Sequence, residues 1–307
     1  CTIDFGDGYS VSLTATNGTV SAPTTVTTGF NGSATFTVTP NSGYKLELET
    51  NTCGGTLSGS TYTISNITSN KTCSIAFKKN GTSLATLIQT NAVNENGYRY
   101  EGSDPNNYIY MENNGTKELW RIIGLFPDGE IGENIIRVRK VGYESAKYDS
   151  NSTNHWPNTT LYTTLSSTYS LTNYMNTVNY KMYLGGSNNL YNYTSANLYD
   201  MERMLNSKGT AGYTSSTSYN SATTYVGSVG LIYPSDYGYA VLASDCARTI
   251  NPSNYSGTSA CYTNNWLYQG SSDIQWLISP KPSLANIACI VNGSGYVLNF
   301  NSTAVVT

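Results

Sequence analysis

The chain reads Asn265-Trp-Leu-Tyr268, then Gln275-Trp-Leu-Ile-Ser-Pro280, then Ala288-Cys-Ile-Val-Asn-Gly-Ser-Gly-Tyr-Val297 near its end. Large apolar residues recur at fixed places in this stretch, and small, polar and aromatic residues fill the gaps. Because apolar residues point inward to hold a fold together, the pattern predicts a rigid frame. The frame residues are Trp266, Leu267, Trp276, Leu277, Ala288, Val291 and Val297. The residues between them remain available to form an exposed, exchangeable surface.

The composition is polar but weakly charged. Charged residues make up 11% of the 307 residues, against about 25% in typical soluble domains, and 27 Tyr with many Ser, Thr and Asn supply the polarity. The net charge of -3 leaves no basic stripe to neutralise phosphates, so we expect no nucleic-acid partner. No apolar run approaches the roughly 20 residues of a membrane-spanning helix. Such a composition is typical of an exposed protein outside the cell.

The cysteines indicate disulfides rather than a metal site. They are Cys1, Cys53, Cys73, Cys246, Cys261 and Cys289, and none forms the close C-x-x-C pair that metal sites favour. Cys53 and Cys73 flank one hairpin-like segment, and Cys246 and Cys261 flank another, so we predict two disulfides. Closing loops of about 20 and about 15 residues would each stabilise the fold by ~3 kcal/mol. Buried free thiols are the alternative, and Cys289, in an apolar strand, is expected to be unpaired.

Residues 1–79 have the pattern of a small all-β domain. Apolar residues alternate in Val11/Leu13/Ala15, Ala34/Phe36/Val38, Tyr44/Leu46/Leu48 and Cys73/Ile75/Phe77, and this period of two is typical of half-buried strands. The segments Thr14-Ala-Thr-Asn-Gly-Thr-Val20, 34–44 and Thr72-Cys-Ser-Ile-Ala-Phe77 resemble the divergent InlB B-type repeat of bacterial surface proteins. The resemblance implies a stalk module that presents another domain.

Residues 80–84 are predicted to form a linker, and residues 85–307 a second domain. Within that domain we expect strands at 108–111, 119–125 and 134–141. Two helices are expected as well. The first spans 195–207, where Leu198, Met201 and Leu205 share one face, and the second spans 161–178 with a weaker apolar stripe.

Two separated motifs of the second domain carry a further resemblance. The first is Trp120-Arg-Ile-Ile-Gly124. The second comes much later and consists of Trp276-Leu-x-Ser-Pro280, Ala288-x-x-Val291 and Gly295-x-Val297. In this order they are similar to motifs of the formylglycine-generating-enzyme-like branch of the C-type lectin fold. The resemblance implies an α+β, C-type lectin-like domain with a mixed sheet, two helices and long loops. Because this family usually closes with one more strand, we expect the domain to be truncated at its C-terminus. An anchor would then lie outside this chain.

Little in the sequence indicates catalysis. His155 is the single histidine, which excludes a multi-histidine metal site, and we expect it to have a surface or capping role. Asp236, Asp245 and Asp273 have no spacing that would pair them for glycoside hydrolysis, so turn and capping roles are expected. The enzyme branch of the resembled family binds copper through a cysteine pair, and the cysteines here do not map onto that pair. We therefore expect no enzymatic activity, no metal and no cofactor.

The predicted binding surface consists of the residues between the frame positions. Tyr supplies a large rigid contact area, whereas Ser, Asn and Gly adapt their hydrogen bonds; Tyr268 and Tyr296 are the expected anchors. The set is Tyr268, Gln269, Ser271, Asp273, Gln275, Lys281, Ser283, Asn286, Asn292, Ser294, Tyr296, Asn299 and Asn301. The alternative is that these are ordinary solvent-facing strand residues. Since some members of the resembled family are diversified by retroelements, hypervariability of this face is a further expectation.

The sequence thus predicts an extracellular or surface-displayed ligand-binding protein, an adhesin or receptor-binding protein of a bacterium or a phage particle. Its partner would be a protein or glycan on a target surface. Two alternatives remain: a structural surface or fibre subunit, which would self-assemble, and an oxidase of the formylglycine-generating type, which would bind copper. In each case we expect Trp120, Trp266 and Trp276 to be buried in the second domain.

Overall fold

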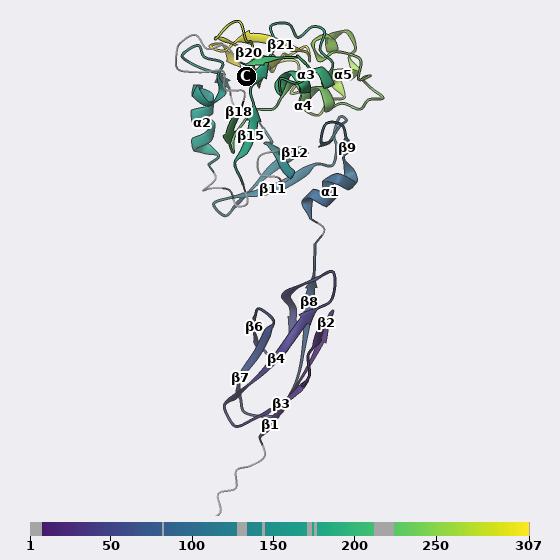
Figure 1. The fold of residues 1–307 in the computed structure, drawn as a ribbon, viewed down its shortest axis with the longest axis vertical. Coiled ribbons are helices and arrows are strands. Elements are labelled where there is room, and N and C mark those ends of the chain that lie inside the picture. Colours follow the sequence, from purple (N-terminus) through teal and green to yellow (C-terminus); the bar gives the residue numbers. More distant parts are fainter. Residues whose placement is uncertain are drawn as a thin grey trace, which may run out of the picture. The chain divides into compact units, whose positions relative to one another are not determined.

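The structure is a computed structural model that describes residues 8–81, 83–127, 134–142, 145–170, 174, 177–211 and 224–306. The chain divides into two compact units, Cys1–Ser83 and Leu84–Thr307 (Figure 1). Strands make up 41% of the structure and helices 16%, so the chain is mostly β. No helix in the described ranges has both the length and the apolar character needed to cross a bilayer.

The first unit is built from two four-stranded sheets. One sheet has the order β3-β1-β8-β5, with β3 (Thr25–Thr28), β1 (Tyr9–Thr16), β8 (Lys71–Lys79) and β5 (Tyr44–Asn51). The other has the order β2-β4-β7-β6, with β2 (Gly18–Val20), β4 (Gly32–Pro40), β7 (Thr61–Ile67) and β6 (Thr56–Ser58). β1 and β8 pair in parallel, and the other pairs are antiparallel.

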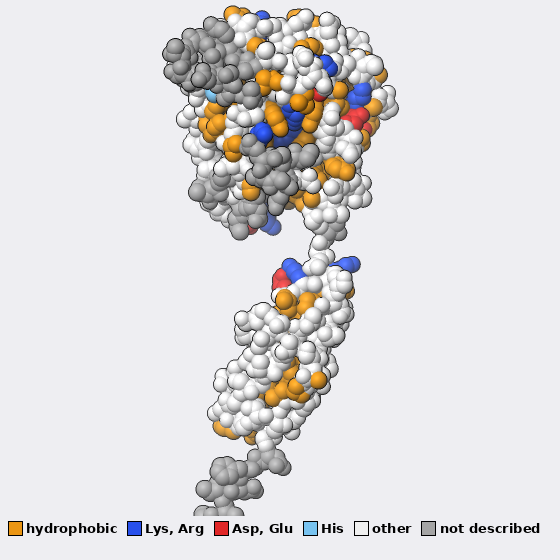
Figure 2. Space-filling view, in the orientation of Figure 1, with side chains coloured by type: hydrophobic (Ala, Val, Ile, Leu, Met, Phe, Trp, Pro, Cys, Tyr) orange, Lys and Arg blue, Asp and Glu red, His pale blue; other side chains and the backbone are white. Residues whose placement is uncertain are grey.

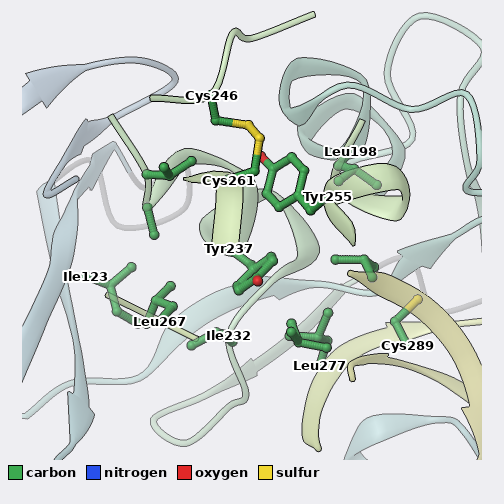
Figure 3. Packing of buried hydrophobic residues seen from close by; sticks show 14 of the residues in the cluster. Ile123, Leu198, Ile232, Tyr237, Cys246, Tyr255, Cys261, Leu267, Leu277 and Cys289 are labelled. Carbon is green, nitrogen blue, oxygen red and sulfur yellow. A yellow bond between two sulfur atoms is a disulfide. The ribbon is translucent and has the colours of Figure 1, made fainter. Parts of the chain in front are cut away.

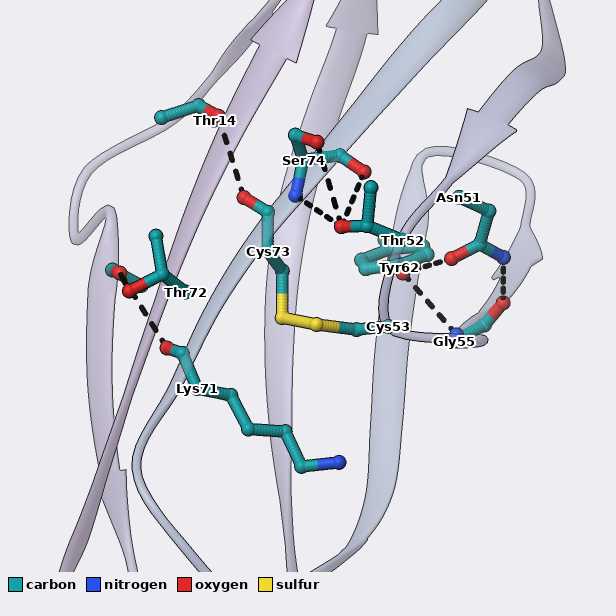
Figure 4. The surroundings of a disulfide bond; sticks show 11 residues. Thr14, Asn51, Thr52, Cys53, Gly55, Tyr62, Lys71, Thr72, Cys73 and Ser74 are labelled. Carbon is teal, nitrogen blue, oxygen red and sulfur yellow. Dashed lines mark hydrogen bonds between the residues drawn. A yellow bond between two sulfur atoms is a disulfide. The ribbon is translucent and has the colours of Figure 1, made fainter.

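Period-two burial explains why the two sheets pack together. In the middle of β4 and of β8 every second residue is buried, and these inward residues join those of β1 and β7 in one apolar cluster. The predicted disulfide between Cys53 and Cys73 is present and ties the turn after β5 to β8 (Figure 4). Beside it, the Tyr62 hydroxyl donates to Asn51 Oδ1 at 2.5 Å and accepts from the Gly55 N–H at 3.2 Å.

A five-stranded sheet opens the second unit. It follows α1 (Leu84–Asn91) and consists of β9 (Val93–Asn94), β10 (Tyr98–Arg99), β11 (Tyr108–Asn113), β12 (Thr116–Pro127) and β13 (Asn134–Lys140). The long strand β12 pairs with β11 and β10 on one side and with β13 on the other. Its register with β13 shifts between Ile122 and Gly124. Because β13 pairs only with β12 among the described residues, it lies at an edge of this sheet. The candidate site borders that edge.

The remaining strands of the second unit form small sheets. The three-stranded one contains β19 (Gln275–Pro280), β20 (Ile287–Val291) and β21 (Val297–Asn301). Two-stranded pairs join β14 (Ala146–Lys147) to β22 (Val305–Val306), β15 (Tyr180–Tyr183) to β18 (Thr224–Gly227), and β16 (Gly185–Gly186) to β17 (Thr210–Ala211). The helices are η1 (Trp156–Asn158), α2 (Thr160–Thr168), α3 (Ser195–Glu202), α4 (Pro234–Tyr239), η2 (Pro252–Gly257) and α5 (Ala260–Thr263).

The prediction of an α+β, C-type lectin-like domain with a mixed sheet and two helices is wrong. Where the structure describes the second unit, its strand pairs are antiparallel and are distributed over several small sheets. Local alternation of apolar residues correctly predicted strands near β11, β12 and β13. Alternation does not encode which strands pair, and the assumed mixed sheet came from the resemblance alone.

Both predicted helices are shorter than expected. α3 ends at Glu202 because Met204, Asn206 and Ser207 adopt positive φ angles of 53°, 52° and 58°, which an α-helix cannot continue through. α2 ends at Thr168, after a run of Ser and Thr that favours helices weakly. Residues 171–173 and 175–176 of the second predicted helix lie outside the described residues, as does Cys1.

The main core of the second unit surrounds α4. Tyr237 and Cys289 are fully buried there (Figure 3), and the Tyr237 hydroxyl donates to the Gly295 carbonyl at 2.7 Å. The second predicted disulfide, between Cys246 and Cys261, lies in this core, and Cys289 is a free, buried thiol as predicted. The three tryptophans expected inside are buried, with exposed fractions of 9%, 5% and 6% for Trp120, Trp266 and Trp276.

Candidate functional site

A cleft of about 1280 Å³ lies in the second unit along β13. Every residue from Asn134 to Gly142 lines it. Successive side chains of a strand point to opposite faces, so an unbroken run of lining residues means that the cleft follows the edge of the strand. The far wall comes from α2, from residues 228–232 and from residues 273–276. Elements far apart in the sequence thus meet across the free edge of β13.

That edge is open to hydrogen bonding. Among the described residues β13 pairs with β12 alone, and the backbone of Asn134–Lys140 forms no bond outside this pair. The Val141 N–H donates to the Leu119 carbonyl, so Val141 faces β12. Since adjacent residues of an antiparallel strand alternate their N–H and C=O groups, Lys140 and Val138 direct theirs toward the cleft.

Aromatic rings form one side of the cleft. Tyr169 and Tyr174 both meet the Trp120 ring edge-on, at centroid distances of 5.7 and 5.6 Å, and all three residues line the cleft. The Lys140 ammonium lies 5.1 Å from the centre of the Tyr169 ring. Figure 2 shows hydrophobic side chains gathered beside Lys and Arg side chains on the visible face of the second unit. Aromatic walls next to fixed cations are typical of ligand sites.

Arg139 is the unusual polar group of this cleft. Its side chain is partly buried, and it makes no hydrogen bond or ion pair to any residue that the structure describes. Arg121 lies directly opposite Arg139 on the neighbouring strand β12. Its guanidinium already donates hydrogen bonds to Asn107 at 2.8 Å and to Asp104 at 3.1 Å. Burial, and secondarily the charge of Arg121, lowers the pKa of Arg139 to about 10. Its guanidinium therefore stays charged at neutral pH, and no described residue accepts a hydrogen bond from it.

Two more polar atoms of lining residues lack partners among the described residues. The Trp120 Nε1 donor and the Gln275 Oε1 acceptor are both buried without a hydrogen bond. Buried polar groups are normally paired, and an unpaired one costs ~1–3 kcal/mol. Together with Arg139 they supply more donor than acceptor capacity. The surplus fits a ligand that brings oxygen acceptors.

Arg137, two residues before Arg139 on β13, differs because its guanidinium has hydrogen-bond partners within the protein. Its Nη1 and Nη2 donate to both oxygens of Asp236 at 2.9 and 2.8 Å, and Arg99 donates to the same carboxylate at 2.6 Å. Burial alone would raise the pKa of Asp236, but the charges of Arg137 and Arg99 hold it below its ordinary value. Asp236 also accepts the Tyr233 N–H at the start of α4, which is the capping role predicted for it. This buried cluster is structural.

A second buried carboxylate lies next to that cluster. Glu202 accepts the N–H and the hydroxyl of Ser235, both at 2.6 Å, and it pairs with Arg203 at 3.1 Å. Burial raises the pKa of Glu202 to about 7, although the charge of Arg203 opposes the increase. Glu202 does not line the cleft, and its hydrogen bonds join α3 to α4.

Seven of the thirteen predicted binding residues fall into two separate groups. Gln269, Asp273 and Gln275 line the cleft. Lys281 and Asn286 lie at the other end of the β19-β20-β21 sheet, because Gln275 pairs with Val291 at one end while Pro280 pairs with Ala288 at the other. The group at the far end is Lys281, Ser283, Asn286 and Asn301. A six-residue strand is ~17 Å long, so the thirteen residues are not one continuous patch.

None of the predicted binding residues is fully buried, and Ser271, Ser283, Ser294 and Asn301 are exposed. Several have structural partners instead of free side chains. The Tyr268 hydroxyl donates to the Gly293 carbonyl at 2.6 Å, and Tyr296 packs against the main core. Asn292 Oδ1 accepts two backbone N–H groups of its own turn. Asn299 accepts the Cys289 thiol.

Arg139 and Trp120 were missed as site residues. The sequence around Arg139 gave one usable signal, because Arg137 and Arg139 alternate with the apolar residues Ile136 and Val138. Cations inside a half-buried strand need partners or an opening to solvent. The sequence does not show which of the two is paired.

The described residues contain no group of three or more His, Cys, Asp or Glu that could hold a metal ion. In the part of the chain that is described, Cys289 is the cysteine outside a disulfide. His155 is partly buried, and burial lowers its pKa. No protein-family model, curated protein or solved structure matches this chain.

Proposed function

We propose that this chain is an extracellular ligand-binding protein whose second unit takes its ligand in the cleft along β13. The observation that carries the proposal is a cleft of about 1280 Å³ along β13 in which the Arg139 guanidinium, on one face of the strand, has no partner among the described residues, while aromatic rings line the other face. A charge kept partly out of water without a partner costs stability. An oxygen-rich ligand that binds in the cleft can pair with this charge and offset that cost.

The location outside the cell is supported by the disulfides Cys53–Cys73 and Cys246–Cys261. Disulfides persist in oxidising compartments and are rare in the cytosol. The weakly charged, Tyr-rich composition fits the same location. Display on a bacterium or a phage particle, with a protein or glycan of a target surface as the partner, is the setting we propose.

A cleft-filling variant tests the proposal. Thr164 is exposed on α2 and lines the cleft, so Thr164→Trp places a large ring in it. The neighbouring Thr163 is also exposed but does not line the cleft, and Thr163→Trp is the matched control. The labelled full chain is applied to a glycan array and to a phage-displayed library of random nine-residue peptides.

We expect at least one of the two collections to yield binders that Thr164→Trp loses at least tenfold and Thr163→Trp keeps. Binders that tolerate Thr164→Trp would place the binding surface elsewhere and refute the cleft. A complete lack of binders in both collections would count against a ligand-binding function. Unchanged far-ultraviolet circular dichroism of both variants shows that the fold is intact.

A further inference from the structure

We infer that the cleft binds an extended peptide segment of a partner protein, added as a strand to the free edge of β13 with an acidic side chain held by Arg139. This inference rests on the proposed function and names the ligand class. Three observations carry it: a backbone edge and a cation that have no partner among the described residues, and apolar side chains on both faces of the strand.

The backbone edge selects a peptide. Lys140 and Val138 direct their N–H and C=O groups into the cleft, and no described residue accepts or donates there. A chain in the extended conformation presents matching groups at the same spacing, and strand addition to an exposed edge is a general mode of peptide recognition. β13 has seven residues, which correspond to ~23 Å of strand. A glycan has no regular series of N–H donors and C=O acceptors to pair with such an edge.

Side-chain alternation then fixes the expected sequence pattern. Arg139 lies on one face of β13, and Lys140 on the other face shares its side of the sheet with Trp120 across β12. A peptide residue opposite Arg139 points to the face of Arg139, whereas its two neighbours point to the face of Trp120 and Lys140. The expected segment therefore has an acidic residue between two apolar or aromatic residues.

Charge complementarity favours an acid at the central position. Glu112 and Asp273 also line the cleft, but neither forms an ion pair with Arg139 in the described structure. The guanidinium can donate two parallel hydrogen bonds to one carboxylate. A carboxylate brought by the peptide would satisfy Arg139 and offset the repulsion from Arg121, which lies directly opposite on β12.

The test uses the full chain and the phage-displayed library of random nine-residue peptides. Selected peptides should be enriched in an apolar–acidic–apolar pattern. A synthetic copy of one such peptide is compared with a copy in which Glu is replaced by Gln, and with a copy N-methylated at alternate residues on the edge-pairing side. We expect each change to weaken binding at least tenfold, as measured by isothermal titration calorimetry.

The protein variant Arg139→Gln should bind the Glu and Gln peptides equally, whereas Lys79→Gln, an exposed cation of the first unit, should behave as wild type. Should Arg139→Gln lose its fold, Arg139→Lys keeps the charge without the planar fork and should reduce the preference for Glu. Equal binding of the Glu and Gln peptides to wild type would overturn the role of Arg139, and tolerance of N-methylation would overturn strand addition.

The outcome also separates this inference from the proposed function. If glycans bind and are lost in Thr164→Trp while no peptide binds, the cleft is a ligand site but not a peptide site. If neither collection yields a cleft-dependent binder, both proposals fail together.

Discussion

Replacing Arg139 and Arg137 separately by Met should change stability in opposite directions, although the two residues lie two positions apart on β13. The folded state lowers the pKa of Arg139 to about 10, roughly two and a half powers of ten below the ordinary value, and each power of ten is about 1.4 kcal/mol. Because the folded pKa is lowered, the charged form costs stability at every pH below the unfolded pKa. The full cost is about 3 kcal/mol; since part of the side chain is exposed, we expect Arg139→Met to recover about 1–2 kcal/mol.

Arg137→Met should instead destabilise the protein. Burial disfavours the charge of Arg137, but Asp236 together with Tyr180 and Tyr233 outweighs this, so the pKa of Arg137 lies above its ordinary value. Removing one partner of a buried ion pair typically costs about 3–5 kcal/mol. Arg99 still donates to Asp236 after the change, and we therefore expect a loss of about 2–4 kcal/mol.

The assay is urea unfolding at pH 7 followed by tryptophan fluorescence. All four tryptophans, Trp120, Trp156, Trp266 and Trp276, belong to the second unit, so the signal reports on that unit. Lys79→Met in the first unit is the control and should leave the midpoint unchanged. The predicted midpoints rank Arg139→Met above wild type and Arg137→Met below it.

A fall of more than about 1 kcal/mol in the free energy of unfolding of Arg139→Met, beyond the usual spread of surface substitutions, would refute a stability cost of the Arg139 charge. That result would mean that Arg139 already has a partner in the folded protein. The proposed anion site would then be filled from within the chain. A neutral Arg137→Met would contradict the buried cluster in the same way.

Three further predictions concern the fold. The pKa of Glu202 is raised to about 7 by burial, above its ordinary 4.5, so its contribution is full below about pH 4.5 and is lost as pH rises through about 7. Wild type should lose up to about 3 kcal/mol across that window relative to Glu202→Gln in urea titrations at each pH, and parallel curves would rule this out. Replacing Cys53 and Cys73 together by Ser should destabilise the first unit by about 3 kcal/mol, measured by circular dichroism, without moving the tryptophan transition; a shift of that transition would contradict independent units. Trp276→Ala should cost about 3–5 kcal/mol through the cavity it leaves, and a change under 1 kcal/mol in urea unfolding would show that the side chain is not part of the core.

Local features of the sequence determined much of what was predicted correctly. The alternation in β4 and β8 marks half-buried strands because inward and outward side chains follow a period of two within each strand. The two disulfides follow from cysteines that flank short segments. Burial of large aromatic residues such as Trp266 follows from their apolar area. Each of these predictions needed only the type and spacing of residues within a short stretch of sequence.

The pairing of strands and the site were decided by the tertiary structure. The prediction of a mixed sheet was wrong because alternation of apolar residues identifies strands but does not determine which strands pair. The predicted surface divided because the register of β19 and β20 places Gln275 and Lys281 at opposite ends of one sheet. Arg137 and Arg139 look equivalent in the sequence. In the fold, Arg137 donates hydrogen bonds to Asp236, 99 residues away, whereas Arg139 lines the cleft. Electrostatic partners are set by contacts in space, and only the fold brings such distant residues together.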